Sequence, residues 1–204
     1  KIENGDISVN GTTAQIGYIL HEGDRIITYA GMRQEPPANR SLKVVYQDPY
    51  IRVFNKPAPI PVHPSGRYFQ NSMTEILKRL YPKEIPRPVQ RLDAITTGVI
   101  VFARTRDVAS VLMDEFMSHR IKKEYLALVE GEPKAENFCI DTPIGILNGS
   151  HRGVGVQIKN AKWAKTEVQW LASKDGFSLL KVTPLSGRTN QIRVHLSSCG
   201  LPIY

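Results

Sequence analysis

Short segments with a clear hydrophobic pattern run along the chain and predict strands more often than helices. Near the N-terminus, residues 7–12 alternate apolar and polar side chains and meet the dipeptide Asn10-Gly11, which favours a tight hairpin turn. Residues 21–28 predict a second turn that leads into another short strand. Gly98–Ala103 is a continuous apolar run with the length of a buried strand. Further strands are predicted at Leu42–Tyr46, Tyr50–Asn55, Tyr125–Val129, Thr166–Leu171 and Phe177–Val182.

Three segments have the spacing of amphipathic helices. The first begins at a capping box, Ser72-Met-Thr-Glu75, the second covers Asp107–His119, and the third covers Arg188–Ser198 and ends at Gly200. The apolar faces predicted for them contain Met73, Ile76, Leu77 and Leu80, then Val108, Val111, Leu112 and Phe116, and finally Ile192, His195, Leu196 and Cys199. Many strands with three helices and no regular βαβ alternation indicate the α+β class rather than a doubly wound sheet.

The composition divides the chain into three parts. Residues 1–30 are a separate β-rich segment, and residues 31–41 are predicted to be a linker because they hold two prolines, a glycine and no periodicity. Residues 42–204 are predicted to form one larger domain. Within it, Thr142–Lys165 is rich in glycine and polar residues and is expected to form long loops with weak strands.

The charge of the chain favours a polyanionic partner. There are 27 Lys and Arg residues against 19 Asp and Glu residues, which gives a net charge of +8 and a pI near 9.5. RNA or DNA is therefore favoured over an anionic membrane surface. No run of eighteen apolar residues exists, so no membrane span is expected. Cys139, Cys199 and the five histidines show no metal-ligand spacing, so no metal site is predicted.

No secretory signal is visible, so the protein is not expected to be secreted. The first residue is Lys1 rather than methionine, and a targeting segment could therefore be absent from this chain. The expected location is the cytoplasm, or the matrix of an organelle if such a segment is missing.

Three runs of residues carry the candidate chemistry. Arg91-Leu92-Asp93 lies just before the apolar strand at Gly98, and alone such a triplet is usually a solvated ion pair. The second run is Ile121-Lys-Lys-Glu-Tyr-Leu-Ala-Leu-Val-Glu-Gly131, and the third is Leu185-Ser-Gly-Arg-Thr-Asn-Gln-Ile-Arg-Val-His195. In this order and at these separations, the three runs resemble the RluA-type pseudouridine synthases. The resemblance covers nearly all of residues 42–204 and implies a mixed, largely antiparallel sheet with a few flanking helices.

The resemblance implies three catalytic residues. Asp93 matches the essential carboxylate that takes part in breaking the N1–C1′ bond of uridine, and Arg193 matches the arginine that pairs with it. Tyr125 matches the tyrosine that packs against the target base. The alternatives are a surface arginine on the third helix for Arg193 and a core tyrosine for Tyr125.

Five further residues are expected to contact RNA. Arg91 matches an arginine that moves toward the space vacated by an extruded uridine, and a structural ion pair is its alternative. Lys56 and Arg67 stand in runs that resemble the family's "NKP" and "VHP" elements, and both are expected to contact phosphate unless they are ordinary solvated charges. Arg188 and Thr97 complete the predicted set.

The chain departs from the family pattern at several positions. Gln90 replaces a usual histidine, Ala94 a usual basic residue, Thr97 a usual serine, and Asn190 a usual histidine. The chain also ends at Tyr204, where family members continue, so the catalytic domain is expected to be incomplete at its C-terminus. The run "VNG…L..GDRI" in residues 1–30 resembles the latter part of an S4-type RNA-binding domain. A β-hairpin appendage without an RNA role is the alternative.

The function expected from these residues is isomerisation of uridine to pseudouridine in tRNA or rRNA. No cofactor is expected because the reaction is redox-neutral, and neither a membrane nor an obligate protein partner is expected. The altered residues keep open a non-catalytic RNA-binding member of the same family. A carboxylate-dependent nucleoside or glycoside hydrolase is the alternative from another class, although no second carboxylate accompanies Asp93 in its motif.

Overall fold

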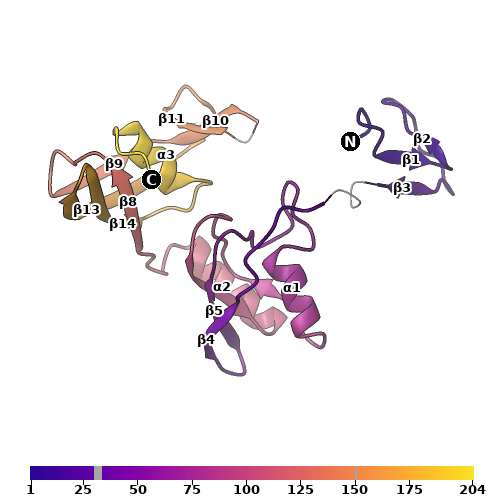
Figure 1. Ribbon diagram of the computed structural model, residues 1–204, viewed down its shortest axis with the longest axis horizontal. Coiled ribbons are helices and arrows are strands. Elements are labelled where there is room, and N and C mark those ends of the chain that lie inside the picture. The colour runs from indigo at the N-terminus through magenta and orange to yellow at the C-terminus, as the bar shows by residue number, and fades with distance from the viewer. Residues whose placement is uncertain (30–33, 150) are drawn as a thin grey trace. The chain divides into compact units, whose positions relative to one another are not determined.

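The computed structural model describes residues 1–29, 34–149 and 151–204 (Figure 1). The first three residues of the predicted linker and Ser150 lie outside these ranges. Contacts divide the chain into two compact units, Lys1–Ser110 and Val111–Tyr204, and each is described by itself. None of the helices among the described residues is long and apolar enough to cross a membrane.

A small antiparallel sheet begins the first unit. Its strands β1 (Ile7–Val9), β2 (Thr12–Thr13) and β3 (Ile26–Thr28) lie in the order β2-β1-β3. The turn between β1 and β2 places Asn10 at φ 53° and Gly11 at φ 85°, the left-handed conformation that this dipeptide favours. The predicted hairpin at Asn10-Gly11 is therefore confirmed, as is the strand predicted after the turn at residues 21–25.

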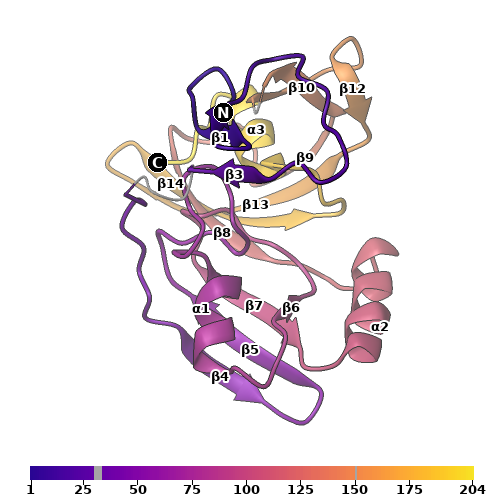
Figure 2. The same ribbon diagram turned by 90° about the vertical axis from the view of Figure 1, so that its right-hand side faces the viewer.

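A four-stranded antiparallel sheet forms the larger part of the first unit. Its order is β4-β5-β7-β6, with β4 (Lys43–Gln47), β5 (Ile51–Lys56), β7 (Gly98–Ala103) and β6 (Arg87–Pro88). The helix α1 (Met73–Leu80) lies beside it, as Figure 2 shows. Phe54 of β5 and Phe102 of β7 pack edge to face with ring centroids 5.5 Å apart, and both are buried. This sheet confirms the strands predicted from the apolar runs in this region.

The start and the apolar face of α1 differ from the prediction. Ser72 stands at the N-cap position, but its hydroxyl donates to the carbonyl of Phe69 and does not cap the helix. Leu80 is 59% exposed rather than buried. The physical reason is that Tyr81 takes the place next to Leu77, where its ring stacks on a buried guanidinium at 3.6 Å.

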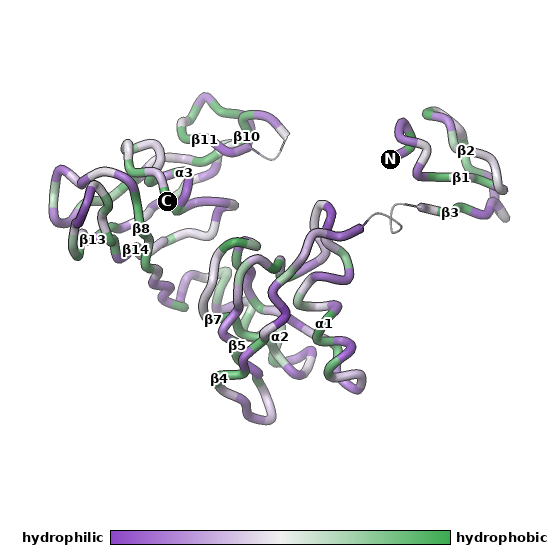
Figure 3. The backbone as a smooth tube through the Cα atoms, viewed as in Figure 1, coloured by the Kyte–Doolittle hydropathy of each residue, from purple (hydrophilic) through white to green (hydrophobic). Residues whose placement is uncertain are grey.

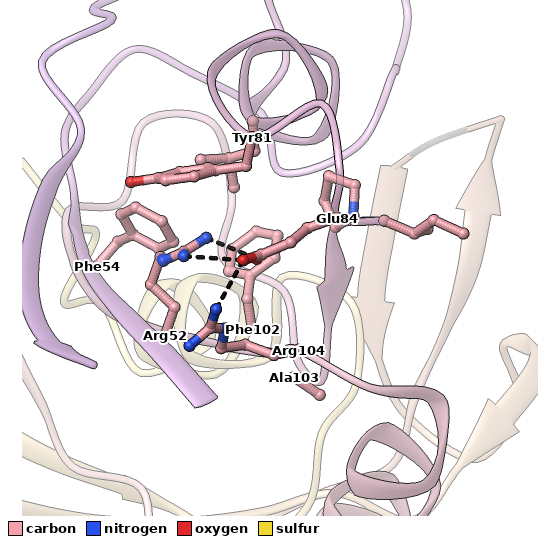
Figure 4. A pocket seen from close by; sticks show the side chains of 10 residues that line it. Arg52, Phe54, Tyr81, Glu84, Phe102, Ala103 and Arg104 are labelled. Atoms are coloured by element: carbon pink, nitrogen blue, oxygen red, sulfur yellow. Dashed lines mark hydrogen bonds and ion pairs between the residues drawn. The ribbon is translucent and has the colours of Figure 1, made fainter. Parts of the chain in front are cut away.

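That guanidinium belongs to Arg52, which is the centre of a cluster of charged side chains between α1 and the sheet (Figure 4). Arg52 is only 6% exposed, and it donates to both carboxylate oxygens of Glu84 at 2.8 and 3.2 Å. Arg104 donates to the same carboxylate at 2.8 Å. Burial raises the pKa of Glu84, but the hydrogen bonds and charges of the two arginines outweigh it, so this pKa lies below its usual value. The cluster joins β5, β7 and the end of α1.

The second unit contains a four-stranded antiparallel sheet and the helix α3 (Gln191–Ser198). The strands lie in the order β8-β14-β13-β9, with β8 (Tyr125–Glu130), β14 (Phe177–Pro184), β13 (Lys165–Lys174) and β9 (Asn137–Asp141). Leu196 of α3 packs against Val129, Val168 and Val182 of the sheet in one apolar core. In Figure 3 the apolar residues are green, and they include residues within β7 of the first unit and β8 of the second. The predicted α+β class with largely antiparallel sheets is confirmed.

A second sheet of this unit lies in the segment that the sequence predicted to be mainly loops. It consists of β10 (Ile144–Asn148), β11 (His151–Val154) and β12 (Lys159–Lys162) in the order β11-β10-β12. A Cβ atom on Gly145 would lie 2.7 Å from a side-chain carbon of Ile158, and one on Gly153 would lie 2.7 Å from Leu147. The glycines that suggested loops are thus needed for close packing inside a sheet.

The other two helices also differ from their predicted limits and faces. α2 runs over Arg106–Met117, and Val111, expected on its apolar face, is 62% exposed. α3 begins at Gln191 rather than Arg188, because Asn190 adopts a left-handed conformation with φ 57° that no α-helix includes. Cys199, expected to be buried on the face of α3, is exposed.

Candidate active site

The loop that holds Asp93 is fixed mainly by hydrogen bonds of its main chain. It joins β6 to β7, and the side chain of Leu92 anchors it in the core of the first unit. The carbonyl of Asp93 accepts a hydrogen bond from the N–H of Thr96 at 3.1 Å, and the carbonyl of Ala94 accepts one from the N–H of Ile60 at 2.9 Å. Asp93 itself is half-buried. Its carboxylate is therefore attached to a defined backbone and is still accessible, as a reacting group must be.

Lys56, the last residue of β5, is completely buried beside this loop. Its ammonium donates to the carbonyls of Pro57 at 3.0 Å, Ile60 at 2.8 Å and Ala94 at 3.1 Å. Burial lowers the pKa of Lys56 to about 8, although the negative charge of Asp93 acts in the opposite direction. An ammonium has three hydrogens, so none is left for a phosphate. The expectation that Lys56 contacts phosphate is therefore wrong, and Lys56 instead ties β5 to the Asp93 loop.

Four more residues of the first unit belong to the sequence motifs of this region. Arg91 and Thr97 lie close to Asp93 in the sequence, and His63 and Arg67 lie in the segment after β5. Burial lowers the pKa of His63, and the positive charge of Arg91 lowers it further. His63 is not among the predicted site residues, although it stands in the Val-His-Pro run. Arg91, Arg67 and Thr97 are exposed. Thr97 precedes Gly98, whose φ of 124° allows the chain to enter β7 at that point.

Gln90, where the family usually has histidine, is partly buried three residues before Asp93. Its side-chain nitrogen donates to the carbonyl of Val99 over a long 3.4 Å. Its side-chain oxygen is buried and has no hydrogen-bond partner among the described residues. An unpaired buried acceptor costs free energy, so this amide is held less firmly than the main chain of the loop.

In the second unit, Gln191 at the start of α3 uses its whole amide to fix the preceding loop. Its oxygen accepts from the hydroxyl of Ser186 at 2.8 Å and from the N–H of Arg188 at 3.0 Å. Its nitrogen donates to the carbonyl of Lys165 at 3.0 Å and to the hydroxyl oxygen of Thr166 at 3.0 Å. The loop that contains Arg188 is thereby attached to β13.

His195, one turn further along α3, is fully buried and continues this network. Its Nε2 lies 2.9 Å from the carbonyl of Thr142, which can only accept, so Nε2 carries the hydrogen. Its Nδ1 therefore accepts from the hydroxyl of Thr166 at 2.8 Å. Burial lowers the pKa of His195 and outweighs the opposite effects of Thr142 and Asp141. His195 and Gln191 are structural residues that hold α3, and no motif in the sequence marked the role of Gln191 in advance.

The predicted residues of the second unit lie on elements that this network and the core position. Arg193 is half-buried on α3, and Arg188 donates from Nε to the carbonyl of Trp163 at 2.9 Å. Tyr125 begins β8, pairs with Val182 of β14 and is partly buried against the apolar core. Its packing thus agrees with the alternative of a core tyrosine, and its half-exposed state leaves part of the ring accessible.

The predicted site residues are divided between the two units. Five of them, Lys56, Arg67, Arg91, Asp93 and Thr97, belong to the first unit, and Tyr125, Arg188 and Arg193 belong to the second. The pairing of Asp93 with Arg193 therefore stays a prediction. No group of three or more His, Cys, Asp or Glu side chains that could hold a metal is found among the residues described.

Comparison with known proteins defines the family. The model of the RNA pseudouridylate synthase family matches residues 50–198, which include Asp93, Tyr125 and Arg193. The chain therefore belongs to the RNA pseudouridylate synthases, and the resemblance seen in its three sequence runs is confirmed.

Individual members of the family are similar to nearly the whole chain. The mitochondrial tRNA pseudouridine(32) synthase of Saccharomyces cerevisiae is 36% identical over 206 residues, which are 99% of this chain and 44% of the relative. The ribosomal large subunit pseudouridine synthase D of Nitrosomonas europaea is 31% identical over 210 residues, 99% of this chain and 60% of the relative. This chain thus spans about half the length of these curated relatives.

Solved structures agree with the fold. The human RNA pseudouridylate synthase domain containing 1 is 27% identical with a TM-score of 0.69, and the match covers 83% of this chain and 70% of that one. The human RNA pseudouridylate synthase domain containing 4 is 29% identical with a TM-score of 0.65, covering 78% and 66%.

Proposed function

We propose that the protein is a pseudouridine synthase that isomerises uridine within structured RNA. The observation that carries this proposal is the family match over residues 50–198. The relatives are named for tRNA and for the large ribosomal subunit, so both RNAs are candidate substrates, and tRNA is tested first because the yeast relative shares more identical residues. The cytoplasm or an organelle matrix, where such RNA is found, is the proposed location.

The proposed reaction exchanges one bond to the ribose for another. The bond between C1′ and N1 of uridine breaks, the uracil rotates, and a bond between C1′ and C5 forms. C5 loses its proton and N1 gains one, so substrate and product are isomers and no electrons are transferred. The reaction therefore needs no redox cofactor, and we propose that the protein uses none.

Asp93 is the proposed catalytic carboxylate. A carboxylate can attack a sugar carbon that gains positive character, or stabilise it electrostatically, as in glycosidases. The half-buried position of Asp93 and the main-chain hydrogen bonds of its loop support this role, because both limit the movement of the carboxylate.

The other residues are proposed to bind and position the nucleotide. Reaching a uridine within folded RNA means extruding it, which costs about a few kcal/mol of unstacking. Exposed Arg91 is proposed to move toward the vacated space, and the accessible part of the Tyr125 ring to pack against the extruded base. Arg193 is proposed to pair with Asp93. Arg67, Arg188 and Thr97 are proposed to contact the RNA backbone.

Nucleoside analysis separates this function from its alternatives. The protein is incubated with uridine-labelled tRNA or rRNA in the presence of a chelator, and the RNA is then digested to nucleosides. We expect pseudouridine. Unchanged uridine would indicate the non-catalytic RNA-binding alternative, which the replacements Gln90, Ala94 and Asn190 motivate, and free uracil would indicate a hydrolase.

The same assay tests Asp93. Asp93→Asn keeps the size of the side chain and removes its charge, so we expect pseudouridine formation to disappear while RNA binding is retained. Asp175→Asn is the matched control, because Asp175 is exposed in the turn before β14 at φ 52°, a conformation that asparagine also adopts. More than a trace of product from Asp93→Asn would reject Asp93 as the catalytic carboxylate.

A further inference from the structure

A wide groove lies in the second unit. It has a volume of about 550 Å³ and is formed by the β10–β12 sheet and the loop before α3. Its lining residues are Ile144, Gly145, Ile146, Arg152, Asn160, Ala161, Lys162, Gly187, Arg188 and Thr189. This volume is within the range of pockets that hold small organic ligands, so a nucleotide-sized group can enter it.

The charge of the groove has one sign. Three of its lining residues, Arg152, Lys162 and Arg188, are cations, and none of the described lining residues is acidic. The surrounding segment Thr142–Lys165 also contains four lysines and arginines but no aspartate or glutamate. Of these, Lys165 is paired with Asp141 at 3.3 Å, whereas the groove cations have no ion pair within the described part of the chain. Their positive charge is available to an anionic ligand.

The groove cations are held by a firm framework. The Nε of Arg188 donates to the carbonyl of Trp163 at 2.9 Å, which orients the guanidinium and leaves its two terminal nitrogens without a hydrogen bond to the described residues. The Gln191 amide also fixes the N–H of Arg188. On the opposite side, the tight packing at Gly145 and Gly153 keeps the sheet that presents Arg152 and Lys162 compact. Little ordering of the main chain is therefore needed when a ligand binds, whereas the side chains of Arg152 and Lys162 become fixed on binding.

An aromatic ring accompanies these cations. Trp163 follows Lys162 directly in the chain and is 48% exposed; it is not itself a lining residue of the groove, but its carbonyl accepts the hydrogen bond from Arg188. Its indole N–H donates to the carboxylate of Asp141 at 3.1 Å, which holds the ring in place. A positioned, exposed ring next to cations is the combination with which proteins bind single-stranded nucleic acid, because bases stack on the ring and phosphates meet the charges.

We propose that this groove binds a single-stranded segment of the substrate RNA, with Arg152, Lys162 and Arg188 on phosphates and Trp163 stacked on a base. The proposal rests on the proposed function for the identity of the RNA. It adds a binding site outside the predicted catalytic residues, formed mainly by a segment whose pattern had indicated loops.

The salt dependence of RNA binding tests the cations. The full chain is titrated with a short uridine-rich single strand and with tRNA, over a series of salt concentrations. In the double variant Arg152→Gln/Lys162→Gln, the slope of log Kd against log salt should fall by about 1.4, which corresponds to about 0.7 for each lost contact with single-stranded RNA. Lys159→Gln is the control, because Lys159 is exposed on the same sheet but does not line the groove.

Tryptophan fluorescence tests the stacking. In a Trp170→Phe background only Trp163 remains, and the single strand should quench its emission. Trp163→Leu should weaken binding of the single strand by about tenfold.

The outcomes separate this proposal from the proposed function. Binding and quenching do not depend on isomerisation, so a chain that binds in this way but forms no pseudouridine supports the groove and rejects the activity. A slope for Arg152→Gln/Lys162→Gln equal to that of Lys159→Gln, or unchanged Trp163 emission with RNA bound, would overturn the groove whether or not the protein is active. A smaller slope of the double variant with tRNA only, and an unchanged slope with the single strand, would also overturn it.

Discussion

A lysine ammonium enclosed by protein loses its hydration, so the fold must offer acceptors for its hydrogens. Three carbonyls do so for Lys56, and one of them, that of Ala94, directly follows the candidate catalytic residue Asp93. Arg52 is a second buried cation of the first unit, and it is neutralised by the carboxylate of Glu84. At the scale of single residues, both cations are buried with hydrogen-bond acceptors, which are neutral carbonyls for Lys56 and a charged carboxylate for Arg52. The contribution of each set of acceptors can be tested.

Lys56→Met should lower both stability and activity. The methionine fits a similar volume, but the carbonyls of Pro57, Ile60 and Ala94 lose a donor, and an unpaired buried acceptor costs about 1–3 kcal/mol. Chemical unfolding measures the loss of free energy, and the pseudouridine assay measures the effect of a less constrained Asp93. Lys43→Met on exposed β4 is the control, which should match the parent in both measurements. Parent-like stability of Lys56→Met would mean that these carbonyls do not depend on the ammonium.

The Glu84 cluster should make the free energy of unfolding fall as the pH is lowered into the acid range. The pKa of Glu84 is lower in the folded protein than its usual value, so the folded state favours the ionised carboxylate. Its contribution is fully present above the unfolded pKa and is lost as the pH falls through the folded pKa. The difference in unfolding free energy between the parent and Glu84→Gln should therefore be largest near neutral pH and shrink below the usual carboxyl range. Glu132→Gln, at an exposed position, is the control variant, and a constant difference for Glu84→Gln would contradict the proposed linkage.

At the scale of elements, α3 shows how side chains decide where a helix begins. Its periodic pattern extends back to Arg188, but the left-handed backbone of Asn190 delays the start to Gln191. The amide of Gln191 then joins the preceding loop to β13, and His195 joins the middle of the helix to the carbonyl of Thr142. The helix that presents Arg193 is thus held at its start and at its centre.

Gln191→Met should therefore loosen the loop that contains Arg188 more than it affects the sheet. It leaves the hydroxyl of Ser186 and the carbonyl of Lys165 without this partner, which we expect to cost about 1–3 kcal/mol. Hydrogen exchange should increase at residues 186–192 and stay unchanged in β14. Gln169→Met, on an exposed position of β13, is the control. Unchanged exchange at residues 186–192 would show that the loop is held by other contacts.

The sequence could predict an element where a local pattern of apolar residues specifies it, and could not where contacts between distant residues specify it. Three strands of each large sheet were predicted because burial of one or both faces imposes a local apolar pattern, whereas the edge strands β6 and β9 were not predicted. The β10–β12 sheet was not clearly predicted. Its glycines leave room for the side chains of Leu147 and Ile158, and no local pattern of apolar residues reveals these contacts. The burial of Lys56 also depends on a carbonyl 38 residues away, at Ala94. Motifs could therefore name Asp93 and Arg193, while the hydrogen bonds that fix the Asp93 loop and α3 required the structure.

At the scale of the whole molecule, the family match continues through both units, whereas the predicted catalytic residues are shared between them. Asp93 belongs to Lys1–Ser110, and Tyr125 and Arg193 belong to Val111–Tyr204. A single activity that needs all three residues would make the two units functionally dependent on each other. The net charge of +8 is a property of the whole chain and suits an RNA substrate that contacts more than one region.

A double-mutant cycle tests this dependence. Arg193→Met alone should lower stability by less than the roughly 3–5 kcal/mol of a fully buried pair, because Asp93 and Arg193 are only half-buried and solvent screens their charges. Adding Asp93→Asn should recover part of that loss, which gives a coupling free energy of about 0.5–3 kcal/mol. The control cycle pairs Arg193→Met with Asp175→Asn and should be additive. Additive losses in the Asp93 cycle as well would show that the two residues are not partners, and the cation that neutralises Asp93 would then be another residue.

The double use of the Ala94 carbonyl has a consequence for how this family can diverge. The N–H of Ile60 and the ammonium of Lys56 both bind that main-chain oxygen, and every residue type supplies the same oxygen. The side chain at position 94 is therefore free to change, even from the basic residue usual in the family to alanine, without altering the path of the Asp93 loop. Mutational drift beside the proposed catalytic carboxylate can then change the side chain that an RNA would meet at position 94, while the geometry of the Asp93 loop is inherited through the backbone.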